Sequence, residues 1–194
     1  LNHLSALGNW DLETYMPEEG LEARGEALAK VASLSQQFFL DKKFVSLIKE
    51  TSQSKDLNEY EKAVIRMLLR SLKFYEKLPP TFIEEFVKTT NEATAIWRRA
   101  KTENNFSLFE PHLRKIVDLT KQKAEYLGYT DHPYDALLDE YEEDLTTKEV
   151  EKYFQSIKTP LVHLINSIKN SPSYKSYHAL EEESYNIEKM QEFN

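Results

Sequence analysis

Apolar side chains recur every three or four residues along most of this chain, and few segments alternate between apolar and polar positions. That spacing places apolar side chains on one face of a helix. Only four glycines and seven prolines occur among the 194 residues. The pattern predicts an all-α fold, built as an array of long antiparallel helices. Because no segment has the Pro, Gly or Ser content of a linker, we expect residues 1–194 to form one helical domain.

Local signals set the expected helix boundaries. A first helix starts after Met16-Pro17 and covers about residues 18–40, and Asp41 is the N-cap of a short helix that follows. Gly128 lies just after a helix, where a positive φ angle is favoured. The remaining helices are expected at about 56–77, from 81 past 97, at 107–127, directly after Pro133, at 146–170 and from about 185.

Polar residues ahead of apolar runs are the expected N-caps of these helices. Asp56, Thr81, Ser107 and Thr146 occupy such positions. Thr81 and Ser107 each have a Glu three residues later, which is the capping-box spacing. Pro160 lies inside the last long helix, which we expect to continue across it with a kink. The apolar side chains of that helix are expected to face inward: Val150, Phe154, Ile157, Leu161, Leu164, Ile165 and Ile168.

The charge and the composition bound the classes of function. With 33 acidic against 25 basic residues, the net charge is −8, which disfavours a nucleic-acid partner because the protein repels phosphate. The absence of cysteine excludes disulfides, thiolate metal sites and a cysteine nucleophile. No apolar run approaches the roughly 20 residues of a membrane-spanning helix, and no signal-peptide pattern precedes Trp10. We therefore expect no membrane partner and a cytoplasmic location.

The histidines and acidic clusters do not form a recognisable metal site. None of the five histidines is followed by Glu, so the chain lacks the His-Glu-x-x-His motif of helical metallopeptidases. His178, with Glu181 and Glu182, supplies too few ligands for zinc, and an exposed histidine is the favoured interpretation. His112 and His163 lie on apolar faces and are expected to be buried or half-buried. The acidic runs at 139–144 and 181–183 lack the glycine of a calcium loop and are expected to be solvated.

Two motifs carry more information than these single residues. Trp10-Asp11 precedes the first predicted helix, and Arg24 lies one to two turns inside it. An Asp11–Arg24 ion pair would fix the start of this helix, and that structural role is the favoured one. The alternative is that Arg24 lies on a substrate groove and holds a peptide carboxylate with two hydrogen bonds.

The second motif, His132-Pro133-Tyr134-Asp135, predicts a rigid turn into a short helix. A structural role is again favoured over a position on a groove.

The two motifs together resemble the N-terminal portion of the thermostable (Taq-type) zinc metallocarboxypeptidases. One matching stretch runs from Asn9 through Trp10, Asp11, Tyr15 and Met16-Pro17 to Arg24. The other runs from Asp131 to Glu142 and contains Pro-Tyr-Asp-Ala-Leu-Leu-Asp-x-Tyr-Glu. Where the family usually has Pro-Gly next, this chain has Glu143-Asp144, which indicates a divergent member.

This resemblance implies a part of an enzyme that removes single residues from peptide C-termini and commonly forms homodimers. The family binds zinc or cobalt through the two histidines of His-Glu-x-x-His and a later Glu, and none of these ligands has a counterpart here. The implied fold is one wall of a helical, zincin-like and neurolysin-like groove, with no catalytic or metal-binding residue of its own. The residues that could line the groove or support it are Trp10, Asp11, Tyr15, Arg24, His132, Tyr134 and Asp135.

A free-standing helical binding or scaffold protein without catalytic activity is the alternative. The two interpretations predict different downstream sequences. A His-Glu-x-x-His motif within about a hundred residues supports the peptidase, and a stop codon supports the scaffold.

Overall fold

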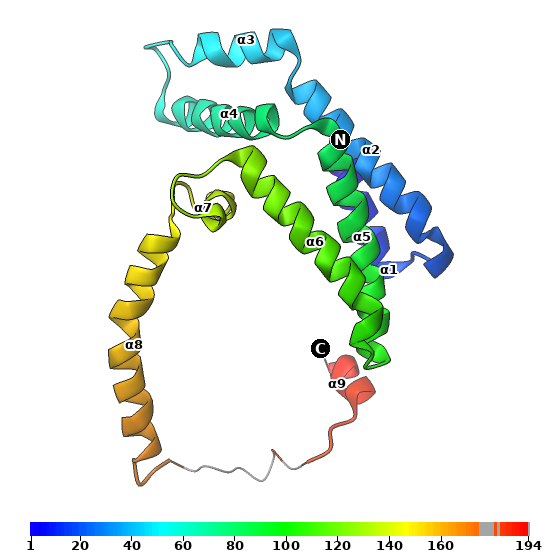
Figure 1. The fold of residues 1–194 in the computed structure, drawn as a ribbon, viewed down its shortest axis with the longest axis vertical. Coiled ribbons are helices and arrows are strands. Elements are labelled where there is room, and N and C mark those ends of the chain that lie inside the picture. The colour runs from blue at the N-terminus through cyan, green and yellow to red at the C-terminus, as the bar shows by residue number, and fades with distance from the viewer. Residues whose placement is uncertain (175–180, 182, 194) are drawn as a thin grey trace.

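The computed structural model describes residues 1–174, 181 and 183–193, and these residues form helices and connections without a β-strand (Figure 1). The all-α prediction is therefore confirmed. A single 3₁₀ turn, η1 (Glu18–Gly20), leads into the second helix. The α-helices of this part of the chain are α1 (Asn2–Thr14), α2 (Leu21–Phe39), α3 (Lys42–Thr51), α4 (Glu59–Lys77), α5 (Pro80–Thr102), α6 (Phe106–Leu127), α7 (Pro133–Leu138), α8 (Thr147–Lys169) and α9 (Ile187–Phe193).

The sequence signals predict several helix ends correctly. The Asp41 carboxylate accepts hydrogen bonds from the N–H groups of Lys43 and Phe44 at the start of α3. Thr146 and Glu149 form a reciprocal capping box at the start of α8. Gly128 ends α6 with a φ angle of 75°, a conformation that favours glycine.

Three predicted N-caps are wrong. Asn58 rather than Asp56 caps α4, because it is Asn58 that lies three residues before Glu61 and can form the reciprocal box. Helix α5 begins at Pro80, whose fixed φ angle suits the first helical position, so Thr81 already lies inside the first turn. Helix α6 begins at Phe106, which places Ser107 inside that helix.

Helix α1 lies in a segment for which the sequence analysis predicted no helix. It has no buried residue, and no side chain caps its N-terminus. Gly8, Asn9 and Asp11 are weak helix formers. Contacts with α2 stabilise α1 instead: Gly8 lies against Leu28 so closely that an added Cβ would come within 2.6 Å of Leu28 Cδ2. Tertiary packing therefore outweighs local propensity in this segment.

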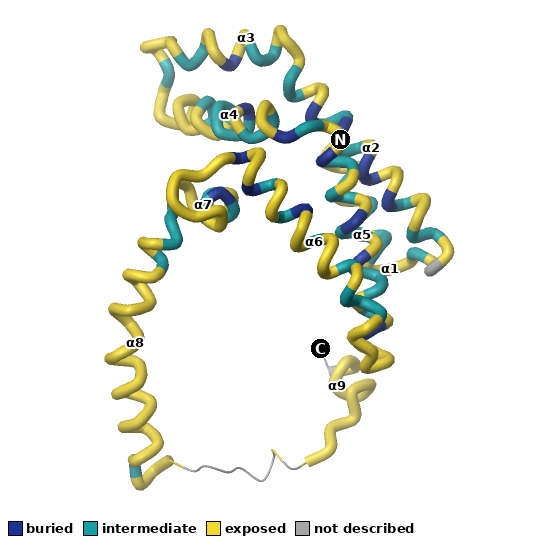
Figure 2. The backbone as a smooth tube through the Cα atoms, viewed as in Figure 1, coloured by how far each residue is buried: buried dark blue, intermediate teal, exposed yellow. Residues whose placement is uncertain are grey.

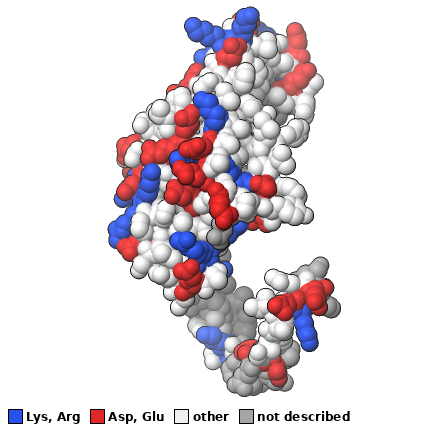
Figure 3. All heavy atoms as spheres, turned by 90° about the vertical axis from the view of Figure 1, so that its right-hand side faces the viewer, with Lys and Arg blue, Asp and Glu red and all other residues white. Residues whose placement is uncertain are grey.

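The core forms where α4, α5, α6 and α7 meet. Its buried cluster comprises Leu78, Phe82, Leu119, Ala124, Leu127 and Ala136. Helix α5 also packs along α2 on one side and along α6 on the other (Figure 1). Figure 2 shows the buried positions concentrated along these helices. On the face drawn in Figure 3, acidic and basic side chains are interspersed.

Helix α8 differs most from the sequence prediction. It continues through Pro160 as one helix, as expected, but residues 151–169 are all exposed (Figure 2). The prediction that its apolar side chains face inward is therefore wrong for six of the seven residues named above, and only Val150 is half-buried. His163, expected to be buried or half-buried, is exposed as well, whereas His112 on α6 is half-buried. In the described part of the chain α8 packs on α7 at its start. The apolar periodicity of α8 therefore marks a helix face that the described residues leave exposed.

Candidate functional site

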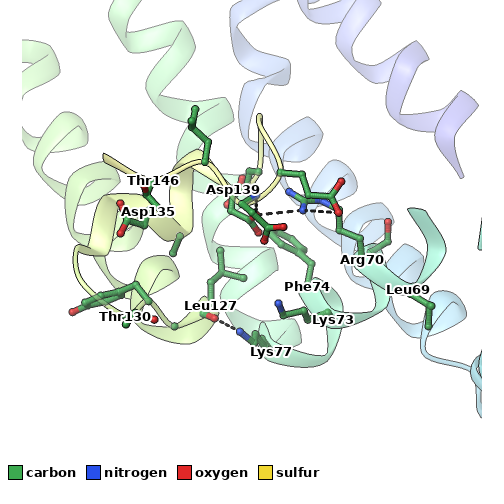
Figure 4. A pocket seen from close by; sticks show the side chains of 18 of the residues that line it. Leu69, Arg70, Lys73, Phe74, Lys77, Leu127, Thr130, Asp135, Asp139 and Thr146 are labelled. Carbon is green, nitrogen blue, oxygen red and sulfur yellow. Dashed lines mark hydrogen bonds and ion pairs between the residues drawn. The ribbon is translucent and has the colours of Figure 1, made fainter. Parts of the chain in front are cut away.

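A pocket of about 860 Å³ opens between α4 and the segment that leads from the end of α6 through α7 to the start of α8 (Figure 4). One wall is a basic stripe on α4, formed by Arg66, Arg70, Lys73 and Lys77. The spacing of four, three and four residues places these side chains on one helix face. The facing wall is acidic and includes Asp135, Asp139, Glu140, Glu143 and Asp144.

Ion pairs join the two walls. Arg70 Nη1 lies 3.3 Å from Asp139 Oδ1 and 3.7 Å from Glu143 Oε1, and Arg66 pairs with the other Glu143 oxygen. Asp139 Oδ1 also accepts from the N–H of Asp144 at 2.8 Å, which holds the connection between α7 and α8. These side chains are between about one third and two thirds exposed, so each pair contributes little alone. Together they set the position of the acidic wall.

The two lysines of the basic stripe, Lys73 and Lys77, have different surroundings from the two arginines. Lys77 Nζ donates to the carbonyl oxygen of Leu127, the last residue of α6, where helix carbonyls lack intrahelical partners. Lys73 lines the pocket and makes no hydrogen bond or ion pair with the described residues. Its ammonium group is therefore available to meet an anionic group, such as a carboxylate, in the pocket.

Asp135 fixes the corner between α7 and α8. Its Oδ1 accepts from the N–H and the hydroxyl of Thr147, both at 2.7 Å, and its Oδ2 accepts from the N–H of His132 at 3.3 Å. The hydrogen bonds from Thr147, ahead of that from His132, lower the pKa of the Asp135 carboxyl below its ordinary value. In return His132 Nδ1 accepts from the N–H of Tyr134 at 3.1 Å. The motif is thus a capping box that also anchors the next helix.

The N-terminal motif forms a second, separate group. The Arg24 side chain is 8% exposed, and it donates to Asp11 Oδ2, to the carbonyl oxygen of Gly8 and to Met16 Sδ. All three guanidinium nitrogens are therefore used by acceptors of the chain itself. This geometry favours the structural role for Arg24 over a role in holding a substrate carboxylate. The rings of Trp10 and Tyr15 contact each other in a tilted arrangement with centroids 5.4 Å apart, and both side chains remain more than half exposed.

The structure thus divides the seven residues predicted from the sequence between two places. Trp10, Asp11, Tyr15 and Arg24 gather where α1 meets α2. His132, Tyr134 and Asp135 lie at the start of α7, and Asp135 is the one among these seven that lines the pocket. The basic stripe on α4 is not among the residues predicted from the sequence. The sequence signal for this stripe is the 4-3-4 spacing of its basic residues, which places them on one helix face. The spacing does not reveal the acidic partners, because these lie about 70 residues further along the chain.

The described residues do not fit a metal. No group of three or more His, Asp or Glu side chains among them is arranged to hold an ion. His178 and Glu182 lie outside the described residues. Among the described helices, none combines the length and the apolar composition that a bilayer crossing requires. We therefore derive no metal-dependent step from the side chains of this part of the chain.

Several solved structures that share this helical arrangement are named carboxypeptidases. The Pyrococcus furiosus carboxypeptidase, solved in an "Apo-Mg" form, superimposes with a TM-score of 0.77 at 42% identity, and the match covers 100% of this chain and 39% of that one. The Trypanosoma cruzi metallocarboxypeptidase 1 superimposes with a TM-score of 0.69 at 26% identity, covering 99% and 39%. The crystal structure of BsuCP superimposes with a TM-score of 0.87 at 28% identity, and the match covers 98% of this chain and 38% of that one. The class defined by this fold is therefore that of the helical metallocarboxypeptidases.

The family follows from the sequence comparison. The model of the carboxypeptidase Taq (M32) metallopeptidases matches residues 1–194, so this chain belongs to that family. Thermostable carboxypeptidase 1 of Pyrococcus furiosus is 42% identical over 194 residues, and carboxypeptidase 1 of Bacillus subtilis is 29% identical over 164 residues. The chain spans 39% of the length of the first relative and 33% of the second.

Proposed function

We propose that this chain is the N-terminal, non-catalytic part of a metal-dependent carboxypeptidase that removes single residues from peptide C-termini. The observation that carries the proposal is the family match over all 194 residues, combined with coverage of only 39% of a relative that is 42% identical.

In this proposal the α4–α7 pocket faces the peptide, and its walls orient the substrate. Lys73 lines the pocket and makes neither a hydrogen bond nor an ion pair with the described residues, so it meets an acidic side chain or the terminal carboxylate of the peptide. The ion pairs of Arg70 with Asp139 and Glu143 hold the pocket open at a fixed width. Arg24 has a structural role in this proposal, because it joins α2 to α1.

The proposal includes a bound zinc or cobalt ion, a cytoplasmic location and a homodimer for the complete protein. The metal supplies the Lewis acid that activates water for peptide hydrolysis, and its ligands lie outside these 194 residues. The absence of cysteine suits a reducing compartment. Elemental analysis, cell fractionation and light scattering on the complete protein test these three statements separately.

The decisive experiment measures amino-acid release by the protein encoded by the complete reading frame. With a blocked dipeptide as substrate, we expect release of the C-terminal residue, loss of that activity with a chelator, and recovery when zinc or cobalt is added back. The chain of residues 1–194, given the same metal, is the matched control and is expected to release nothing. A metal-replete complete protein without activity, or activity in the 194-residue control, contradicts the proposal. A reading frame without His-Glu-x-x-His supports the helical scaffold instead.

A further inference from the structure

Helix α8 carries an apolar stripe that the described residues leave uncovered. We define the α8 stripe as Phe154, Ile157, Leu161, Leu164, Ile165 and Ile168. These residues follow one another at intervals of mostly three and four, so they share one face of the helix. Their exposed fractions run from 42% for Ile165 to 64% for Phe154. Polar residues such as Gln155, His163 and Asn166 occupy the opposite face.

A helix of this kind needs a packing partner. Its 23 residues extend about 35 Å at 1.5 Å per residue. Most of the stability of a helix in a protein comes from packing its apolar face, and among the described residues the main packing partner of α8 is the six-residue α7 at its start. Soluble proteins rarely leave so long a continuous apolar surface in water, and such surfaces mark interaction sites.

We propose that the α8 stripe is the docking surface for the helical remainder of the same polypeptide, the part of the family chain that lies beyond the 39% spanned here. This inference rests on the proposed function, because it takes the chain as one part of a longer enzyme. Elements that follow one another along a chain usually pack together, and α8 is the last long helix described. The occupant is therefore a predominantly helical segment with an apolar face, which would complete the layer that α8 begins.

The absence of cysteine from these 194 residues permits a direct test by thiol labelling. Single variants Ile165→Cys and Asn166→Cys place a thiol on the α8 stripe and on the opposite face of the same turn. In the complete protein we expect the thiol at position 165 to react at least about tenfold more slowly than that at 166, because packing excludes the reagent. In the 194-residue chain both thiols should react at similar rates. Peptide mass spectrometry separates these sites from any other cysteine of the complete protein.

A second pair, Ile157→Cys and Gln155→Cys, repeats the comparison two turns earlier and covers the case in which one variant fails to fold. Equal rates at the two faces in the complete protein overturn the proposal. Protection of the stripe in the 194-residue chain that increases with protein concentration also overturns it, because the occupant is then a second copy. Labelling does not depend on activity, so an inactive complete protein with a protected stripe counts against the proposed function alone.

Discussion

The side-chain amide of Gln36, in the last turn of α2, donates a 2.6 Å hydrogen bond to the carbonyl oxygen of Leu78, 42 residues later. The same nitrogen donates to the carbonyl oxygen of Tyr75 at 2.8 Å. Both carbonyls belong to the end of α4, where helix geometry leaves them without intrahelical partners. Gln36 of α2 therefore caps α4, just as Lys77 of α4 caps α6 through Leu127.

Replacement of Gln36 tests this cap. Gln36→Leu removes both hydrogen bonds from a side chain that is 1% exposed, which leaves two carbonyl groups unsatisfied. Gln36 Oε1 itself has no partner among the described residues, so the variant also removes one unfavourable buried atom. We expect the free energy of unfolding, measured by urea titration, to fall by about 1–3 kcal/mol. The exposed neighbour variant Gln37→Leu should change it by less than about 0.5 kcal/mol. Equal losses in the two variants would show that the cap has no special role.

Arg24 should matter for stability and not for metal binding. Arg24→Ala removes three interactions that join α2 to α1 and to the following turn, and we expect a loss of about 2–3 kcal/mol in the free energy of unfolding. Arg24→Lys should recover only part of this loss, because one ammonium group cannot reach all three acceptors that the planar guanidinium group reaches. Arg114, whose exposed side chain forms an ion pair with Glu110, serves as the control. Arg114→Ala should lower the free energy of unfolding by less than about 0.5 kcal/mol. In the complete protein the metal content should stay unchanged, and loss of metal with the fold retained would refute this assignment.

Asp135 should make the stability of the α7–α8 corner depend on pH. Its folded pKa is lowered, so the unfolded state binds more protons in the window between the two pKa values, and stability rises with pH there. The contribution is fully present above the unfolded pKa of about 4 and is lost as the pH falls through the lower folded value. Asp135→Asn should reduce stability at pH 7 by about 1 kcal/mol, because a neutral amide oxygen accepts the hydrogen bonds from Thr147 less strongly than the ionised carboxylate does.

The difference between the wild type and Asp135→Asn should therefore shrink as denaturation is repeated at decreasing pH below 4. Glu149 has a lowered pKa for the same kind of reason, through its hydrogen bonds with Thr146, and is present in both proteins. It therefore cancels in the comparison. If the difference in the free energy of unfolding stays constant down to the lowest pH, the ionised form of Asp135 does not stabilise the α7–α8 corner.

Replacement of two helical glycines by alanine should change the stability of the protein in opposite directions. A Cβ on Gly25 of α2 would meet nothing nearer than Lys88 Cγ at 3.9 Å, so Gly25→Ala should stabilise the protein by about 0.5–1 kcal/mol. A Cβ on Gly8 of α1 would lie 2.6 Å from Leu28 Cδ2, and Leu28 is buried. Gly8→Ala should therefore destabilise by about 1 kcal/mol, because displacing Leu28 outweighs the gain in helix propensity. Thermal melts of the two variants give the signs, and a higher melting temperature for Gly8→Ala would contradict the close packing of α1 on α2.

Lys73 connects the pocket to the proposed function. In the complete protein, Lys73→Ala should raise the KM for a peptide that carries a carboxylate into the pocket by about three- to tenfold, with kcat unchanged, because a binding contact is lost. Lys62 lies on the same helix outside the pocket, and Lys62→Ala should leave both constants unchanged. A fall in kcat with unchanged KM would assign Lys73 a role other than substrate binding.

The local signals of the sequence succeeded where the interacting residues are near one another in the chain. The caps at Asp41 and Thr146, the short helix after Pro133 and the end of α6 at Gly128 all depend on contacts within a few residues. The capping-box spacing alone was insufficient at Thr81 and Ser107, since a proline and an asparagine one or two residues earlier had already started those helices. Local spacing is decisive only when no neighbouring residue offers an earlier start.

The amino-acid sequence by itself thus determined that the chain is helical, where most helices end and which family motifs it carries, because these depend on short-range periodicity and capping. Only the tertiary structure decided which helices meet. It paired Arg70 with Asp139, placed Gln36 on the end of α4, and formed α1 against Leu28 despite its weak propensity. These contacts join residues far apart in the chain, and no local spacing encodes them. For α8 the sequence specified an apolar face, and the tertiary structure left that face exposed to solvent.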